Sequence, residues 1–190
     1  MKKTILPWLC LCALVRAQAE LRVPAFTAYL EPDPDGAQVS SRSGISDWTD
    51  PSLQVLWFGE IKTPGRLDCS LELRLPAGVK SKLRLTVAGK SSDVTVAGAG
   101  DNPVKADFGS FDIPAVGYQK FTLESLNAKD QPAGDLQTLV LDGPAAVDAH
   151  FNLDPRRNAA SVHLAYPTAG CTNIDAFYCE VTATETPLWT

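Results

Sequence analysis

The sequence has no apolar run long enough to cross a membrane. Its longest run, from Ile5 to Val15, is shorter than the about 20 residues that a membrane-spanning helix needs. The run follows a basic start and precedes Ala17-Gln18-Ala19, a pattern of small residues that is typical of a cleavage site. We therefore predict that residues 1–19 are a secretory signal peptide. The mature protein would be secreted or periplasmic, with no membrane span.

Basic residues are scarce. The chain has 17 lysines and arginines against 22 aspartates and glutamates. Loss of residues 1–19 removes Lys2, Lys3 and Arg16, which leaves 14 basic and 22 acidic residues and a net charge of −8. Such a charge argues against nucleic acid and against anionic membranes as partners. It is compatible with an uncharged ligand such as a polysaccharide.

Histidine and cysteine are also scarce. There are two histidines, and the cysteines beyond residue 19 are Cys69, Cys171 and Cys179. A zinc site takes about four nitrogen or sulfur ligands at characteristic spacings, which these residues do not form. Cys69 lies in an apolar phase and is predicted to be a buried free thiol. Cys171 and Cys179 are close in the sequence of an exported chain, so we predict a disulfide between them.

We predict no cofactor and no metal site. The acidic turn at residues 31–36 offers oxygen atoms that suit calcium. It lacks the full alternating acidic pattern with a distal glutamate, so a simple Asp-Gly turn is the preferred interpretation.

No segment has the pattern of a long helix. Short alternating segments, separated by glycine and proline, recur about every ten residues, which is typical of an all-β sandwich or barrel. The clearest is Arg66 to Leu75, in which every second residue is leucine or cysteine. We predict an antiparallel β-sandwich, jelly-roll-like. Its strands would span residues 23–31, 37–43, 53–61, 66–75, 82–88, 92–97, 104–113, 118–126 and 136–142, with residues 45–51 in a loop.

Residues 147–167 have the pattern of a β-hairpin. Val147 to Leu153 alternates between apolar and polar residues, and residues 162–166 do so again after a polar turn. Pairing the strands symmetrically about the turn places His150 opposite His163, and Asn152 beside them on the outer face. These three residues are candidates for binding a ligand. An ordinary solvated strand face is the alternative.

Trp48 is the best candidate for a sugar-stacking platform. It lies in a polar loop between Asp47 and Asp50, and glycan sites combine an aromatic ring with carboxylate partners. The alternative is that Trp48 folds back and closes one end of the sandwich, because large aromatic side chains are usually mostly buried.

Catalytic patterns are missing. Glycoside hydrolysis needs two positioned carboxylates, and the sequence selects no such pair. A G-x-S-x-G motif is absent, and a Ser–His–Asp set would have to come from Ser161, a histidine and Asp148 on an exposed strand. We expect this chain not to be an enzyme.

Four segments carry a resemblance to a known family. VPAFTAYLEPDPDGA, GISDWTD, VLWFGEIKTPGRL and HFNLDPRRNAASVHLAYP resemble exported bacterial proteins that have an N-terminal domain of unknown function 5077 (DUF5077). In that family a domain of unknown function 3472 (DUF3472) follows. The resemblance implies a β-sandwich similar to carbohydrate-binding modules at residues 20–155. Residues 156–190 would be a linker and the truncated start of a second β domain.

Together these features predict an exported, non-catalytic β-sandwich module. We expect it to bind glycan or to be accessory to a neighbouring domain, so its expected partners are a polysaccharide or that domain. The alternative is a purely structural domain that packs against a second domain or a partner protein.

Overall fold

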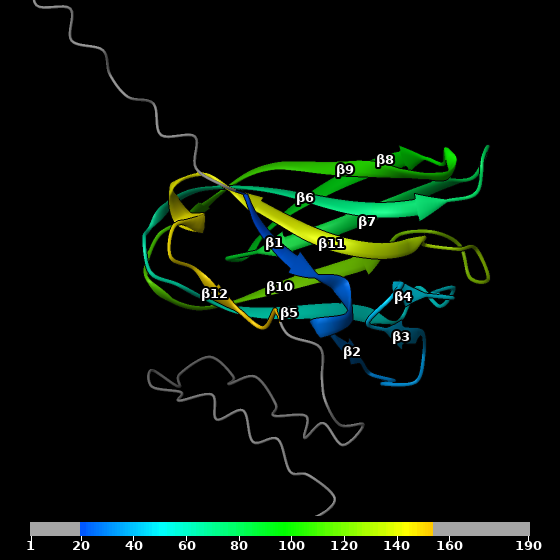
Figure 1. Cartoon of the computed structure of the whole chain (residues 1–190), viewed down its shortest axis with the longest axis horizontal. Helices are drawn as coiled ribbons and strands as arrows, with labels where there is room; N and C mark the ends of the chain where they lie inside the picture. The colour runs from blue at the N-terminus through cyan, green and yellow to red at the C-terminus, as the bar shows by residue number, and fades with distance from the viewer. Residues whose placement is uncertain (1–19, 154–190) are drawn as a thin grey trace, which may run out of the picture.

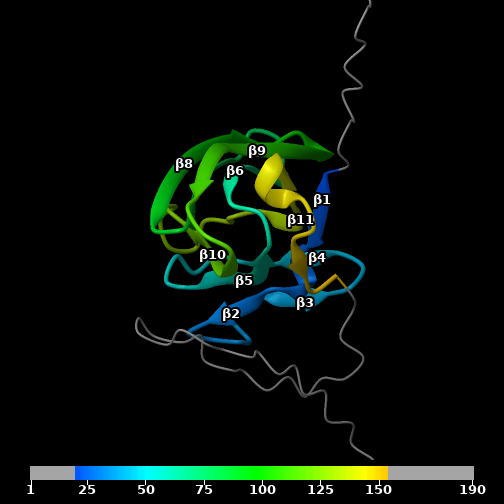
Figure 2. The same cartoon turned by 90° about the vertical axis from the view of Figure 1, so that its left-hand side faces the viewer.

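Alternating strands build two antiparallel sheets that face each other in the computed structural model, which describes residues 20–153 (Figures 1 and 2). Sheet A has the order β3-β4-β11-β6-β9, with β1 also paired to β11. Its strands are β1 (Leu21–Pro24), β3 (Gln38–Ser40), β4 (Gly44–Ser46), β6 (Gly65–Leu75), β9 (Gly100–Ile113) and β11 (Asp135–Asp142). The predicted antiparallel β-sandwich is therefore confirmed.

Sheet B has the order β12-β5-β10-β7-β8, with β2 also paired to β5. Its strands are β2 (Tyr29–Glu31), β5 (Gln54–Ile61), β7 (Lys80–Val87), β8 (Lys90–Ala97), β10 (Gly117–Ser125) and β12 (His150–Phe151). Two short 3-10 helices, η1 (Ala25–Thr27) and η2 (Pro144–Ala146), lie between strands. Within residues 20–153, no helix has the length and apolarity that crossing a membrane requires.

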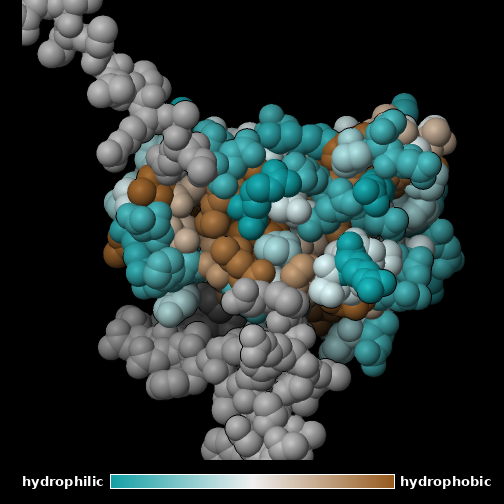
Figure 3. Space-filling view, in the orientation of Figure 1, coloured by the Kyte–Doolittle hydropathy of each residue, from teal (hydrophilic) through white to brown (hydrophobic). Residues whose placement is uncertain are grey.

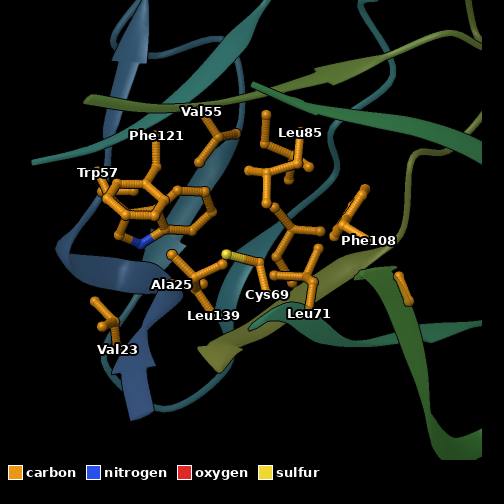
Figure 4. Packing of buried hydrophobic residues seen from close by; sticks show 14 of the residues in the cluster. Val23, Ala25, Val55, Trp57, Cys69, Leu71, Leu85, Phe108, Phe121 and Leu139 are labelled. Carbon is orange, nitrogen blue, oxygen red and sulfur yellow. The ribbon is translucent and has the colours of Figure 1, made fainter. Parts of the chain in front are cut away.

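The inward phases of both sheets form one core. In β6 the alternating Leu67, Cys69, Leu71, Leu73 and Leu75 are all buried. Figure 4 shows the rings of Trp57 and Phe121, from sheet B, facing the Cys69 side chain of sheet A. Cys69 is a free thiol, as predicted, and burial raises its pKa well above the usual range. A thiol that stays protonated in an apolar site acts as a small core residue.

The seven predicted strands from residue 53 to residue 142 correspond to β5 through β11, with ends shifted by a few residues. The predicted strand at residues 37–43 is only β3, and the predicted loop at residues 45–51 begins within β4. The prediction failed at these short elements because two or three paired residues leave almost no periodic signal.

The predicted strand at residues 23–31 is wrong, because the segment changes sheets. β1 pairs with β11 in sheet A, whereas β2 pairs with β5 in sheet B. Between them the backbone turns through η1, where the Ala28 N–H donates to the Ala25 carbonyl at 3.0 Å. The Thr27 hydroxyl donates to the Pro24 carbonyl at 2.8 Å and stabilises this turn. The segment thus links the two sheets on one side of the sandwich.

The predicted strand at residues 147–153 is shorter than expected. The chain is still turning after η2, since Asp148 has a φ of 54° and the Ala149 N–H donates to the Ala146 carbonyl. Only His150 and Phe151 form a strand, and Leu153, which was predicted to point inward, is exposed. His163, Cys171, Cys179 and residues 1–19 and 156–190 lie outside the described residues. The hairpin partner, the disulfide, the signal peptide and the second domain therefore stay predictions.

Candidate functional site

Trp48 is not a sugar platform, because its side chain is only 1% exposed. The indole N–H donates to the Asp50 carbonyl at 2.9 Å, and the Trp48 carbonyl accepts from the Ala133 N–H at 2.9 Å. The loop therefore folds back over one end of the core, which is the alternative that the sequence left open. A ring held on both sides in this way offers no face to a ligand.

Asp47 and Asp50 are exposed beside this end of the sandwich. The Asp50 carboxylate accepts from the Ser52 backbone N–H at 2.8 Å and from its hydroxyl at 2.7 Å. These hydrogen bonds lower the pKa of Asp50. The charge of Asp47 instead acts on Asp135, whose pKa is raised by burial first and by Asp47 second. Both predicted residues thus shape a loop, and their predicted tryptophan partner is buried.

The outer face of sheet B presents the aromatic side chains that the Trp48 loop does not. In β5 the residues Val55, Trp57 and Ile61 point into the core, so the alternate residues point outward. Phe58 is one of these outward residues, and Tyr118 of β10 is another, with 45% of its surface exposed. The sheet register therefore brings to one surface two aromatic residues that are 60 positions apart in the chain.

Three outward aromatic residues, Tyr29, Phe58 and Tyr118, form what we call the aromatic strip. Tyr29 of β2 pairs with Leu56, two positions before Phe58. The Tyr29 and Phe58 rings meet edge to face, with centroids 5.7 Å apart and an angle of 65°. Tyr118 pairs with Glu60, two positions after Phe58. The strip thus runs diagonally across β2, β5 and β10.

Hydrogen-bonding groups flank both ends of the aromatic strip. At the Tyr118 end, Glu60 lies 3.7 Å from His150 Nδ1 and 3.7 Å from Lys62 Nζ. Towards the Tyr29 end, the Gln54 amide donates to the Glu124 carboxylate at 3.0 Å. Carboxylates and amides can exchange hydrogen bonds with sugar hydroxyls. The arrangement can therefore stack a sugar ring and orient it.

His150 has the outward orientation that the sequence predicted. It pairs with Glu60 across β12 and β5, and Glu60 in turn pairs with Tyr118, so these three side chains form one row across the sheet. Asn152 follows directly after β12 and is half-buried. The row therefore joins a predicted site residue to the aromatic strip.

The outer face of sheet A differs from this surface. Its outward side chains are mostly polar and paired, as in the ion pair of Arg22 with Glu72 and the hydrogen bond from Ser110 to Asp68. Phe108 and Phe111, the aromatic residues of its described strands, belong to the core. Among the described residues, stacking side chains on a sheet surface are therefore a property of sheet B.

Sequence reasoning missed Phe58 and Tyr29 and treated Tyr118 as a cap on the core edge. A usable signal was present. Phe58 shares its phase with Gln54 and Glu60 rather than with Trp57, and Tyr118 shares its phase with Lys120. An aromatic residue in the polar phase of a strand indicates exposure.

The acidic turn at residues 31–36 holds itself without a metal. The Asp35 N–H donates to the Asp33 carboxylate at 3.0 Å, and the Gly36 N–H donates to the Asp33 carbonyl at 3.1 Å. Within residues 20–153, no group of three or more acidic, histidine or cysteine side chains is placed to hold a metal ion. The described residues therefore do not fit a calcium site.

A family model described as Domain of unknown function (DUF5077) matches residues 23–146, from β1 to η2. The chain belongs to this family. The match covers nearly the whole sandwich but ends before β12, so His150 and Phe151 extend the DUF5077 region of this chain. No curated protein matches the sequence.

Known structures similar to this DUF5077 chain are carbohydrate-binding modules. One is the CBM36-1 domain of a multidomain xylanase from the hindgut metagenome of Trinervitermes trinervoides, with 13% identity, a TM-score of 0.53, and coverage of 66% of this chain and 98% of that chain. Another is CBM35 from Cellvibrio japonicus Abf62, with 13% identity, a TM-score of 0.53, and coverage of 70% and 97%.

A third similar structure is a carbohydrate-binding module CBM36 in complex with calcium and xylotriose. It has 13% identity, a TM-score of 0.51, and coverage of 64% of this chain and 99% of that chain. At such low identity these likenesses show the shared β-sandwich fold, and the site must be argued from this chain's own residues.

Proposed function

We propose that this protein is an exported, non-catalytic module that binds glycan through the aromatic strip on sheet B. The observation that carries the proposal is the exposed Tyr118 ring beside Glu60, in line with Phe58 and Tyr29. Apolar faces of sugar rings stack on such side chains, while neighbouring carboxylates accept hydrogen bonds from hydroxyls. The family's fold is shared with modules described as carbohydrate-binding, which supports the same class of ligand.

The spacing of the flanking carboxylates supports a role in binding rather than in hydrolysis. Glu124 pairs with Gln54, and Gln54 is six positions from Glu60 along β5. Six strand positions correspond to about 20 Å. The paired carboxyl groups of glycosidases are only about 5–9.5 Å apart. Glu60 and Glu124 therefore cannot act together on one glycosidic bond.

Affinity electrophoresis of the full chain tests the proposal. Gels containing soluble xylan, β-1,3-galactan or β-1,4-mannan should retard the wild-type protein in at least one case. Tyr118→Ala should remove most of that retardation, while Tyr118→Phe should keep it, because the ring is what stacks. Val116→Ala is the matched control, since Val116 is also exposed but lies outside the strip. Retardation that survives Tyr118→Ala would place the site elsewhere.

Export is part of the same proposal. Its support is the basic start, the short apolar run and the Ala17-Gln18-Ala19 pattern. N-terminal sequencing of the protein recovered from an exporting bacterial host should give a chain that starts near Glu20. A cytoplasmic protein that retains Met1 would contradict it.

A docking role is the second candidate. β12 lies beyond the part of the chain that matches the family, and Figure 3 shows a hydrophobic patch in the region of β1, η2 and β12. We propose that residues 156–190 begin a unit that resembles DUF3472, and a docking module would hold that unit at this patch. A chain that binds none of the polysaccharides, but protects residues 156–190 from limited proteolysis, would favour docking.

A further inference from the structure

We propose that the aromatic strip binds the interior of an extended, uncharged glycan chain that crosses β2, β5 and β10 diagonally. This inference rests on the proposed function and specifies the form of the ligand. A binder of single sugars or of chain ends would need one enclosed platform. The strip instead distributes its contacts along a line.

The register sets the length of this line. Phe58 is two positions after Leu56, the partner of Tyr29, and two positions before Glu60, the partner of Tyr118. Each diagonal step between neighbouring strands is about 7–8 Å. From Tyr29 to Tyr118 the strip covers four strand positions and two strand spacings, which together amount to about 16 Å. This length exceeds one sugar ring, so a ligand that contacts both ends must be a chain.

The rings divide the strip into two contact points. Tyr29 and Phe58 meet edge to face at 5.7 Å and form one corner. Tyr118 lies in the next row outward, beside Glu60 and His150, and pairs with neither ring. One sugar unit of a chain would occupy the corner while another unit stacks on Tyr118. Affinity would then increase with chain length until both points are filled.

The position of the strip on a sheet surface favours the interior of a chain. The strip is made of outward residues in the middle of three strands, and Tyr118 is 45% exposed. A chain laid on such a surface can continue past both contact points. Its reducing end therefore has no special place in the complex.

The charges around the strip favour an uncharged chain. Glu60 is balanced by Lys62 and His150 at 3.7 Å, and Arg84 is held by Asp93 through two hydrogen bonds of 2.7 and 3.0 Å. Paired charges leave no concentrated positive field for uronates. The Glu60 and Glu124 carboxylates accept hydrogen bonds from neutral hydroxyls at little electrostatic cost.

Isothermal titration with the full chain tests the inference. The probes are oligosaccharides of one to six units, prepared from whichever of xylan, β-1,3-galactan or β-1,4-mannan retards the protein. The hexasaccharide should bind about tenfold or more tighter than the monosaccharide, since each added stacking contact contributes up to about 1.5 kcal/mol. A hexasaccharide reduced with borohydride at its end should bind as tightly as the untreated one.

Variants show whether both contact points are used. Tyr118→Ala should lower the affinity for the hexasaccharide by about tenfold and leave disaccharide binding at the Tyr29–Phe58 corner within about twofold. Tyr29→Ala should lower the affinity for the hexasaccharide in the same way. Circular dichroism of each variant checks that it is folded. Equal loss for the hexasaccharide and the disaccharide would overturn the two-point arrangement.

The outcomes separate this inference from the proposed function. Equal affinity for the monosaccharide and the hexasaccharide overturns the inference while glycan binding stands. Loss of binding on end reduction also overturns it, as does tighter binding of polygalacturonate than of any neutral polymer. Failure of every polymer to retard the wild-type chain overturns both.

Discussion

The Phe151 ring lies directly over Gly59, its cross-strand neighbour, and occupies the space where any other side chain would start. A Cβ placed on Gly59 would be 2.2 Å from Phe151 Cζ. The same ring meets Phe121 edge to face, with centroids 5.3 Å apart and an angle of 64°. The missing side chain at position 59 is therefore what allows β12 to dock on β5 and its aromatic residue to join the core.

Gly59→Ala should displace Phe151 and loosen β12. Because Gly59 has no positive φ, alanine fits the backbone and only the contact with Phe151 is lost. Overpacking of this kind costs about 1–3 kcal/mol in the free energy of unfolding. Urea denaturation of the full chain, followed by tryptophan fluorescence, measures the loss.

A double mutant shows whether the Phe151 ring is the cause. In the Phe151→Ala background, Gly59→Ala should cost nothing further, because the atoms that clash are gone. The two substitutions would then be strongly non-additive. Additive losses would mean that Gly59 matters for another reason.

Trp48→Ala and Tyr118→Ala should differ in stability, although both remove an aromatic ring. Trp48 is 1% exposed, so its removal should cost about 3–5 kcal/mol in the free energy of unfolding. Tyr118 is 45% exposed, so its loss should change stability by about 0.5 kcal/mol or less. Thermal denaturation of the two variants makes the comparison. Similar melting temperatures would contradict the assignment of Trp48 to the core.

The strands could be predicted from the sequence where one face is buried over many residues. β6 is the best case, because alternate residues from Leu67 to Leu75 all enter the core. The segment at residues 23–31 looked like one strand because both halves are apolar. The sequence could not show that η1 turns the chain from one sheet to the other, since that depends on which strand each half meets.

The site was harder to predict than the fold. Trp48 looked exposed because its sequence neighbours are polar, yet its loop is held by the Ala133 N–H from a distant segment. The aromatic strip depends on register, because Phe58 and Tyr118 come together only through the pairing of β5 with β10. Hydrophobic periodicity identifies faces within a strand but does not establish which strands are neighbours.

Asn127→Ala should destabilise the end of the sandwich that Trp48 closes. The Asn127 side chain accepts from the Lys82 N–H at 2.8 Å and donates to the Ser81 hydroxyl and the Pro132 carbonyl, each at 3.0 Å. Ser81 is buried and donates in turn to the Ala133 carbonyl at 2.9 Å. Loss of this connected set should cost about 2–3 kcal/mol in the free energy of unfolding.

Two variants serve as controls for Asn127. Asn127→Asp keeps the acceptor for the Lys82 N–H but loses both donors, so it should be intermediate only if the donors contribute. Asn102→Ala removes an exposed asparagine of β9 and should change stability by about 0.5 kcal/mol or less. A loss for Asn127→Ala no larger than that for Asn102→Ala would contradict the role of the network.

Asp135→Asn should stabilise the protein at neutral pH. Burial raises the pKa of Asp135, the Asp47 charge raises it further, and Arg74 on the neighbouring strand opposes both effects. A carboxyl whose pKa is higher in the folded protein than in the unfolded chain favours folding less when it is ionised. Asparagine has no charge and removes this cost. Because Asp135 is largely in contact with water, the gain should be about 0.5 kcal/mol or less.

The pH dependence distinguishes this effect from any other consequence of Asp135→Asn. The gain should be present at pH 7 and should decrease as the pH falls through the raised pKa of Asp135. It should be absent below the ordinary carboxyl pKa of about 3.9, where Asp135 is protonated in both states. Urea denaturation of wild type and Asp135→Asn at pH 7 and pH 3 measures this, with Asp101→Asn as an exposed control. Asp47→Asn should give a gain of the same sign, because it removes the repelling charge that the fold places beside Asp135; a gain for Asp135→Asn that persists at pH 3 would show that the charge is not its cause.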